Sequence, residues 1–280
     1  MDSGEDTIQT PDGLILHYQW QSSPTPRGVI LIVHGIGEHI GRYQTLEEWF
    51  CEQRFTCYGF DQRGHGRSTG RRTHVADFSE YVADLRQITG LVQEREPGLP
   101  IFIYAHSMGA VVALLGVLHD PNSYKGLIIA SPAIAIGSSI PGWMLKMGSM
   151  LAKFLPTKET SSQIEPSNLS HDPEIVAAYK NDTLVEGTVT LGWLASMLAA
   201  QKKVLRAAPE INVPLLILHS CADQVAAIAG THQLIERLPK DKATYHEYAE
   251  AYHELHNETG AVRAAVLNDV EDWLDHQLTM

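Results

Sequence analysis

Residues 101–115 place a serine between two apolar runs, and this stretch limits the fold more than any other part of the chain. Ile101 to Tyr104 are apolar or aromatic and rich in β-branched side chains, and a second apolar run begins at Val111. Small residues surround Ser107 between the two runs. The pattern predicts a buried strand, a sharp turn and a buried helix, which together hold a serine hydroxyl at the carboxyl end of a strand.

Strand signals and helix signals alternate along most of the remaining sequence. Residues 29–33 are apolar at every position, as expected for a strand covered by helices on both faces. From Asp77 to Glu96, apolar side chains recur every three or four residues, which predicts a long helix with one face on a core. This alternation predicts an α/β fold with a mostly parallel central sheet flanked by helices. The predicted strands cover residues 14–20, 29–33, 55–60, 101–104, 126–132, 214–219 and 244–248, and further helices cover 46–53 and the end of the chain.

The alternation breaks between residues 135 and 209. Two apolar helical segments occupy this region, which has too few residues to bury a core of its own. We therefore predict one α/β core formed by residues 1–134 and 210–280, with residues 135–209 inserted as a mainly helical cap. The first apolar segment carries Ile140, Trp143, Met144, Met147, Met150, Leu151, Phe154 and Leu155, and the second carries Leu191, Trp193, Leu194, Met197 and Leu198.

Composition excludes several classes of function. A net charge of -12 and the lack of clustered Lys and Arg argue against a nucleic-acid partner. No apolar run approaches the roughly 20 residues that span a membrane, and the acidic first six residues lack the features of a signal peptide. The three cysteines, Cys51, Cys57 and Cys221, have no metal-ligand spacing. We therefore expect a cytoplasmic protein without a metal site, in which Cys221 is buried and inert.

Three residues with complementary chemistry fall at the carboxyl ends of predicted strands. A serine becomes a strong nucleophile only when a base accepts its proton, and the base needs an acid that fixes its tautomer. Ser107, Asp223 and His253 supply one residue for each role, in the chain order of an α/β-hydrolase. His246 and His256 are rival bases, but His246 lies in a predicted strand and His256 falls beyond the loop, near a helix start.

The same strand ends offer donors for a negatively charged oxygen. Met108 directly follows the serine, and Ile36 lies between two glycines in the loop after the strand 29–33. We predict that their backbone N–H groups form an oxyanion hole. A simpler interpretation of Ser107 taken alone is a helix N-cap, which the joint placement of three residues disfavours. Four side chains in nearby loops are expected to make hydrogen bonds that shape the turns: Glu38, His39, Arg63 and His65.

Four short motifs stand in these loops. They are His34–His39 with Arg42-Tyr43, the run 61–68 (Asp-Gln-Arg-Gly-His-Gly-Arg-Ser), Ala105–Gly109, and the run 252–258 (Tyr-His-Glu-Leu-His-Asn-Glu). Together they resemble the monoacylglycerol lipase and lysophospholipase family of α/β-hydrolases, and the last motif is the most specific. The resemblance implies hydrolysis of fatty-acid monoesters of glycerol without a cofactor, beneath a mobile apolar cap. It assigns the nucleophile, acid and base to Ser107, Asp223 and His253, and the oxyanion donors to Ile36 and Met108.

The chain departs from the family pattern at two places. Ala105 and Ala110 stand where the family usually has glycine, and each adds a methyl group where strand and helix pass closely. We expect a slightly wider turn that stays feasible. The loop 220–226 lacks the usual glycine near its start and the usual polar residue after its valine. We expect this second departure to change the shape of the pocket more than the mechanism.

These features predict a serine hydrolase that cleaves carboxylic esters of fatty acids, with monoacylglycerols as the main expected substrates. A lysophospholipase and a general carboxylesterase use the same chemistry, and a non-catalytic binding protein on a hydrolase scaffold is a more remote alternative. An apolar stripe of this size also suggests contact with a membrane surface or with a second copy of the chain. Five apolar side chains of the cap are expected to bind the acyl chain: Trp143, Met144, Met147, Leu151 and Phe154.

Overall fold

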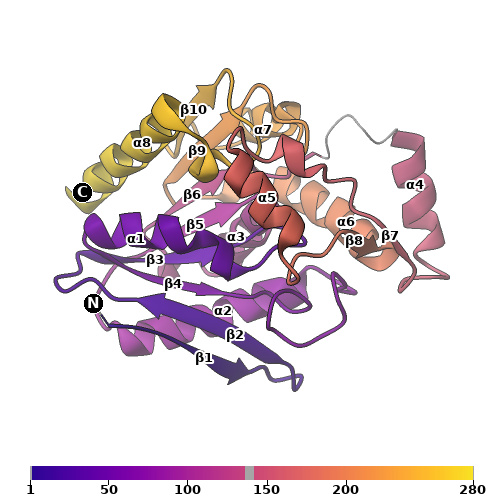
Figure 1. Cartoon of the computed structure of the whole chain (residues 1–280), viewed down its shortest axis with the longest axis horizontal. Helices are drawn as coiled ribbons and strands as arrows, with labels where there is room; N and C mark the ends of the chain where they lie inside the picture. The colour runs from indigo at the N-terminus through magenta and orange to yellow at the C-terminus, as the bar shows by residue number, and fades with distance from the viewer. Residues whose placement is uncertain (1, 136–141, 280) are drawn as a thin grey trace.

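The computed structural model describes residues 2–135 and 142–279, and an eight-stranded sheet lies at its centre (Figure 1). The strand order is β1-β2-β4-β3-β5-β6-β9-β10. β2 pairs antiparallel with β1 and with β4, and all the other neighbours pair parallel. The predicted mostly parallel sheet is therefore confirmed. Its strands are β1 Ser3–Gln9, β2 Ile15–Gln21, β3 Gly28–Val33, β4 Phe55–Phe60, β5 Ile101–His106, β6 Gly126–Ala130, β9 Leu215–Ser220 and β10 Ala243–Tyr248.

Helices cover both faces of the sheet, as the apolar runs of the central strands predict. In β3, Ile30 and Ile32 belong to one layer of buried apolar side chains, and Leu31 and Val33 belong to the other. Helices α1 and α8 cover the first layer, whereas α2, α3, α6 and α7 cover the second. The α-helices that cover the sheet are α1 Gln44–Glu52, α2 Ser79–Arg95, α3 Met108–His119, α6 Leu191–Ala207, α7 Ile228–Ile235 and α8 Gly260–Thr279. Short 3-10 helices cover Ile40–Tyr43, Pro121–Ser123, Pro166–Asn168, Ala208–Glu210 and Leu255–Asn257.

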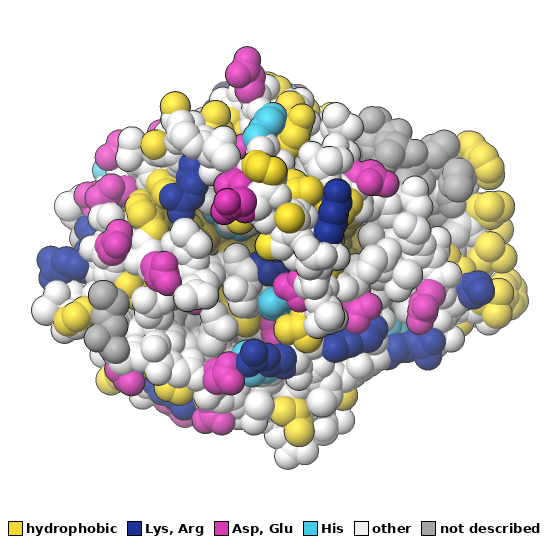
Figure 2. Space-filling model, viewed as in Figure 1, with side chains coloured by type: hydrophobic (Ala, Val, Ile, Leu, Met, Phe, Trp, Pro, Cys, Tyr) yellow, Lys and Arg dark blue, Asp and Glu magenta, His cyan; other side chains and the backbone are white. Residues whose placement is uncertain are grey.

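The region after β6 contains helices that differ in burial. It holds α4 (Gly142–Leu151), α5 (Pro173–Asn181), α6, and a small antiparallel sheet of β7 (Glu159–Ser161) and β8 (Thr188–Thr190). Helix α6 contributes Met197 and Val204 to the main core. Helix α4 packs against α6 at the edge of the molecule, where apolar side chains are exposed (Figures 1 and 2). The boundaries of the cap at residues 135 and 209 stay a prediction.

Strand β1 was not among the predicted strands, and its place at the sheet edge explains why. It pairs with β2 along its whole length, from Ser3 opposite Gln21 to Gln9 opposite Ile15. Only two of its seven residues are even partly buried. Because backbone pairing and not side-chain burial defines this strand, its sequence carries no apolar alternation. Across the described part of the chain, no helix combines the length and apolar character needed to cross a membrane.

Candidate active site

Ser107 occupies a strained turn between β5 and α3. Its backbone has φ +54° and ψ -116°, a conformation that residues with side chains rarely adopt. The Ser107 N–H donates to the Ala130 carbonyl at 3.1 Å, and the Ser107 carbonyl accepts the N–H groups of Ala110 and Ala133 at 3.2 and 3.1 Å. The serine side chain makes no capping hydrogen bond to α3. The N-cap interpretation therefore does not apply, and the hydroxyl is available for chemistry.

Close packing around this turn involves one glycine and two alanines. A side chain at Gly109 would overlap the backbone carbonyl of Val33, so this glycine lets α3 begin directly against the end of β3. Ala105 and Ala110 are both fully buried. The turn accommodates the methyl group that each of these alanines adds.

Asp223 and His253 meet from the loops that follow β9 and β10. His253 Nδ1 lies 2.8 Å from Asp223 Oδ2, and Asp223 Oδ1 accepts the N–H groups of Val225 and Ala226 at 2.8 and 3.0 Å. Nδ1 of His253 therefore carries a proton, and Nε2 is the nitrogen left to act as a base. Burial alone raises the pKa of Asp223, but the facing His253 and a hydrogen bond from His219 hold that pKa far below its usual value. The carboxylate stays ionised at neutral pH.

Ser107 and His253, the predicted nucleophile and base, share one cavity. Ser107 and His253 line the same small space and are both buried, with 4% and 2% of their surface exposed. Two backbone hydrogen bonds join the His253 loop to the chain before α5. The N–H of His253 donates to the Asn168 carbonyl at 3.3 Å, and the N–H of Glu254 donates to the Leu169 carbonyl at 2.8 Å. The position of the base therefore depends on residues of the predicted cap.

The loop after β3 passes beside Ser107. A Cβ atom at Gly35 would lie 2.6 Å from Oε1 of Glu38 and 3.2 Å from the Cβ of Ser107, so the glycine lets the loop pass close to both side chains. The next residue, Ile36, and the first residue of α3, Met108, both line the main cavity. The structure thus brings both residues of the predicted oxyanion hole to the cavity that Ser107 also lines.

Glu38 is the centre of a buried hydrogen-bond network beneath this loop. Its Oε1 accepts the N–H of Gly35 at 2.5 Å and the hydroxyl of Tyr43 at 2.8 Å, and it lies 3.1 Å from Nδ1 of His106. Burial alone raises the pKa of Glu38, but the hydrogen bond from His106 and the charge of Arg42 keep that pKa well below its usual value. The network joins the loop that carries Gly35 and Ile36 to His106, the residue that precedes Ser107.

Arg42 extends the network to the loop of the base. It donates to Glu38 Oε2 at 2.8 Å and binds both carboxylate oxygens of Glu254 at 2.7 and 2.9 Å. Its guanidinium also lies 4.7 Å from the ring centroid of Tyr179 in α5. Sequence reasoning missed the roles of Arg42 and Glu254. The only local signals were the spacing between Glu38 and Arg42 and the position of Glu254 next to the base.

The other polar residues near the strand ends shape turns, as predicted. Arg63 donates to both oxygens of Asp84 at 2.6 and 2.7 Å, and His39 Nε2 lies 2.7 Å from Asp182 Oδ2. His65 is fully buried, and burial lowers its pKa to about 3, so its ring is neutral. These contacts hold the loops in place without approaching Ser107.

The two rival histidines lie in other environments. His246 is part of β10 and pairs with a carboxylate of α8. His256 is buried against the ring of Tyr43 at a centroid distance of 4.9 Å, and burial lowers its pKa to about 3. Of these three histidines, His253 is the one whose ring nitrogen contacts Asp223.

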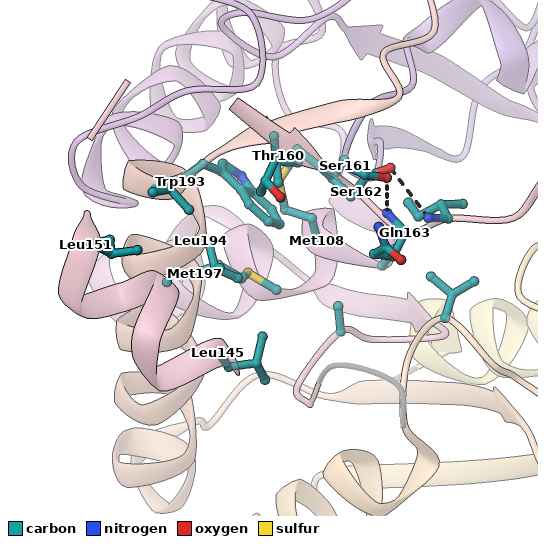
Figure 3. Close-up of a pocket in the computed structure, with 18 of the residues that line it drawn as sticks. Met108, Leu145, Leu151, Thr160, Ser161, Ser162, Gln163, Trp193, Leu194 and Met197 are labelled. Atoms are coloured by element: carbon teal, nitrogen blue, oxygen red, sulfur yellow. Dashed lines mark hydrogen bonds between the residues drawn. The ribbon is translucent and has the colours of Figure 1, made fainter. Parts of the chain in front are cut away.

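An apolar cavity of about 350 Å³ opens beside Ser107 (Figure 3). Helices α4 and α6 supply seven of its thirteen apolar lining residues, and the segment 160–163 adds a polar border. Its apolar lining fits a hydrocarbon chain better than a sugar or a peptide. The apolar side chains are Ile36, Met108, Ala133, Leu145, Met147, Leu151, Ile164, Val189, Leu191, Trp193, Leu194, Met197 and Val225.

The five residues predicted to bind an acyl chain do not all face this cavity. Met147 and Leu151 line it. Trp143 and Phe154 are 65% and 81% exposed and are not part of its lining. The side chain of Met144 lies outside the described residues. The sequence pattern identified the second apolar segment, in α6, but did not assign it to the acyl site.

Cys221 corrects one expectation, because its side chain is exposed and not buried. It stands in the turn where the chain leaves β9, and its Sγ lies 2.8 Å from Oε1 of Glu247. The hydrogen bond with Glu247 raises the pKa of the thiol, so Cys221 is not an activated nucleophile. Within residues 2–135 and 142–279, no three His, Cys, Asp or Glu side chains are grouped so as to hold a metal ion.

Known proteins match the chain over most of its length. The family described as serine aminopeptidase, S33, matches residues 24–260. Monoacylglycerol lipase of Mycolicibacterium smegmatis is 31% identical over 261 residues, covering 93% of this chain and 92% of that protein. Monoglyceride lipase of Rattus norvegicus is 32% identical over 262 residues, covering 93% and 86%. The crystal structure of Paleococcus ferrophilus monoacylglycerol lipase has a TM-score of 0.83 and 26% identity, covering 99% of this chain and 100% of that one.

Proposed function

The chain belongs to the monoacylglycerol lipase family of α/β-hydrolases, and we propose that it hydrolyses monoacylglycerols to glycerol and free fatty acid. One observation carries this proposal. Ser107, beside the paired His253 and Asp223, opens into an apolar cavity of about 350 Å³. The polar groups supply the chemistry of ester cleavage, and the cavity supplies a place for the acyl chain.

The reaction begins when His253 Nε2 accepts the proton of the Ser107 hydroxyl. The serine oxygen attacks the ester carbonyl, and the carbonyl oxygen takes the negative charge. His253 then gives its proton to the leaving glycerol oxygen, which leaves an acyl-serine. Water enters, loses a proton to His253 and attacks the acyl-serine, which releases the fatty acid and restores Ser107. Asp223 stays ionised throughout and stabilises the imidazolium form of His253.

The backbone N–H groups of Ile36 and Met108 bind the negatively charged oxygen. The donors are held in advance, Ile36 by the hydrogen bond from Gly35 to Glu38 and Met108 by the start of α3. Donors that need no rearrangement are the most effective, because the enzyme spends no free energy on orienting them during the reaction. Loss of one such donor typically raises the barrier by about 3 kcal/mol.

The test compares substrates and one matched pair of variants. We expect release of fatty acid from a long-chain monoacylglycerol, slower release from a lysophosphatidylcholine of equal chain length, and no cleavage of an aminoacyl nitroanilide. Ser107→Ala should abolish turnover to at most a small residual. Ser131→Ala is the control, because Ser131 is also buried, has φ +47° and follows the neighbouring strand β6, yet does not line the cavity. Equal turnover by Ser107→Ala and wild type would refute the proposal.

We also propose that the exposed side of α4 and the turn after it contact a lipid surface. Trp143, Met150 and Phe154 are 65%, 68% and 81% exposed, and Lys153 and Lys158 stand exposed beside them. An apolar group flanked by cations is suited to an anionic membrane surface, and the proposed substrates partition into membranes.

Vesicle sedimentation tests this contact. Phe154→Ser should reduce binding to vesicles of phosphatidylcholine with phosphatidylserine several-fold, whereas Ile15→Ser should not, because Ile15 is 43% exposed on the distant strand β2. Equal binding by both variants would count against the proposal, and a concentration-dependent dimer lost in Phe154→Ser would assign the surface to a second copy of the chain.

A further inference from the structure

The carboxylate of Asp223 is contacted by two imidazoles and not one. Nδ1 of His253 lies 2.8 Å from Oδ2, and Nε2 of His219 lies 3.1 Å from the same oxygen. Oδ1 is occupied by the two N–H groups of the following turn. Four donors therefore surround the acid, and the two side-chain donors share Oδ2. The proposed reaction uses His253 and leaves His219 without a role.

The surroundings of His219 fix the position of its protons. The residue is fully buried near the end of β9. Its Nε2 faces two acceptors, Asp223 Oδ2 and the Ala226 carbonyl at 3.2 Å, so Nε2 must carry a proton. Its Nδ1 lies 2.6 Å from the hydroxyl of Thr231, which is also fully buried and can donate to it. Thr231 thus favours the one neutral tautomer that lets His219 donate to the acid.

This donor acts on the acid in two ways. It ties the carboxylate, which is part of a loop, to strand β9, which is paired on both sides by β6 and β10, and so limits rotation of the carboxylate away from His253. It also takes up part of the negative charge of Oδ2, because a hydrogen bond to an ionised oxygen stabilises the charge on that oxygen. His253 then faces a less basic partner than an isolated aspartate.

We propose that His219 is a positioning residue for the Asp223–His253 pair, holding the carboxylate toward the base and reducing the affinity of the base for its proton. The consequence for turnover rests on the proposed esterase function, whereas the consequence for the titration of His253 does not. Thr231 supports His219 in this role by fixing its tautomer.

Other charged groups near His253 are the same in every variant of the test. Nε2 of the His106 ring lies 3.3 Å from the His253 carbonyl, and the two rings are 4.6 Å apart between centroids. Beyond His106 lie Glu38, which contacts His106, and Arg42, which donates to both Glu38 and Glu254. None of these residues has a hydrogen bond with His219, so replacing His219 acts on His253 through the shared carboxylate of Asp223.

The test follows the histidine rings by NMR in the resting full-length protein labelled with ¹⁵N and ¹³C histidine. In the wild type, the ¹⁵N shifts of His219 should show a neutral ring protonated at Nε2. A proton on Nδ1 alone would overturn the proposal without any substitution. In His219→Leu, the pH at which His253 titrates should rise by roughly half a unit or more, because Asp223 regains the charge that His219 had stabilised.

His219→Gln is the matched variant, because its amide N–H can take the place of Nε2–H. It should titrate at His253 close to the wild-type pH. In kinetics with a short ester, His219→Leu should lose about tenfold to a hundredfold in kcat with KM nearly unchanged, and His219→Gln should recover most of that loss.

Three results would contradict the inference: no change at His253 in His219→Leu, an equal change in His219→Gln, or a loss confined to KM. If His219→Leu does not fold, the wild-type ¹⁵N shifts still test the proposal, because a ring without a proton on Nε2 could not donate to Asp223 and would overturn it. A wild type without ester turnover would refute the proposed function, and the titration would still decide the role of His219.

Discussion

The two halves of the site are built from different interactions. The polar floor consists of Ser107, Asp223 and His253 with the network of Glu38, Arg42 and Glu254, where short hydrogen bonds, several of them from backbone N–H groups, fix the carboxylates. The apolar wall consists of Trp193, Leu194 and Met197 on α6, which packs on the main core, and of Met147 and Leu151 on α4, whose side chains are partly exposed. Packing alone holds these side chains. In the proposed reaction, directional bonds lie where charge and protons move, and nondirectional contacts lie where an acyl chain of variable length would bind.

The largest expected effect falls on the floor. Asp223→Asn should lower kcat/KM for a short ester by about 10³–10⁴-fold, because an amide in place of the carboxylate favours the wrong tautomer of His253. Steady-state kinetics measures the loss, and urea unfolding checks that the variant is folded. Asp241→Asn, on an exposed aspartate, is the control. A loss smaller than tenfold would mean that the floor does not depend on its acid.

A smaller loss is expected one layer further from the serine. Glu38→Gln should destabilise the fold by about 3 kcal/mol, because it leaves the buried Arg42 with a single carboxylate partner. It should also lower kcat/KM about 10–100-fold by loosening the loop that carries Ile36. Glu48→Gln, at an exposed position in α1, should change neither quantity. Wild-type kinetics in Glu38→Gln would show that the network supports the fold only.

A buried carboxylate close to the floor, Asp61, should make the stability of the fold sensitive to acid; its Oδ1 accepts the N–H of Ile40, two residues after Glu38. Burial alone raises the pKa of Asp61, but a hydrogen bond with His17 and two backbone N–H groups lower it from 3.8 to about 2. Because the folded-state pKa lies below the unfolded one, Asp61 stabilises the fold fully above about pH 4, and this contribution is lost as the pH falls toward 2. Its size is roughly 2–3 kcal/mol.

Urea unfolding of Asp61→Asn tests this sign. The variant should be less stable than the wild type by roughly 2–3 kcal/mol at pH 7, and the difference should shrink as the pH falls through 3. A constant difference between pH 7 and pH 2 would assign the loss to packing and not to charge. Parallel titrations of Asp241→Asn should follow the wild-type curve.

The smallest effect is expected on the wall. Met147→Ala should lower kcat/KM for a long-chain ester about fivefold, equivalent to roughly 1 kcal/mol of lost apolar contact, and should leave a butyrate ester unaffected. Met150→Ala is matched in helix and residue type, but Met150 is 68% exposed and does not line the cavity. If Met147→Ala slowed short and long esters equally, the wall would also be aligning the floor, and the comparison between the two halves would fail.

The sequence predicted the elements whose side chains form local patterns. Strand β4 was placed to the residue, although Thr56 and Gly59 interrupt its apolar run. The turn at Ser107 was placed correctly, because the apolar run of β5 ends there and small residues follow. The structure then brings His253 to Asp223, although 30 residues separate them, because both follow neighbouring parallel strands. Their roles in catalysis stay a proposal.

Three features left no local pattern to find. The bond between Arg42 and Glu254 joins residues 212 positions apart, and such a pairing is invisible along the chain. Strand β1 is defined by backbone pairing alone. Trp143 and Phe154 belong to an apolar stripe whose two sides look alike in sequence, so the pattern could not show which side faces the cavity and which faces outward.

The backbone hydrogen bonds from His253 and Glu254 to Asn168 and Leu169 have a consequence for inhibition. Separating these two segments would free His253, the proposed base, to move away from Asp223. A small molecule wedged between them would therefore silence the enzyme while substrate still bound, and its effect would not be relieved by more substrate. Movement of α4 alone would leave this seam closed, because α4 takes no part in these two hydrogen bonds.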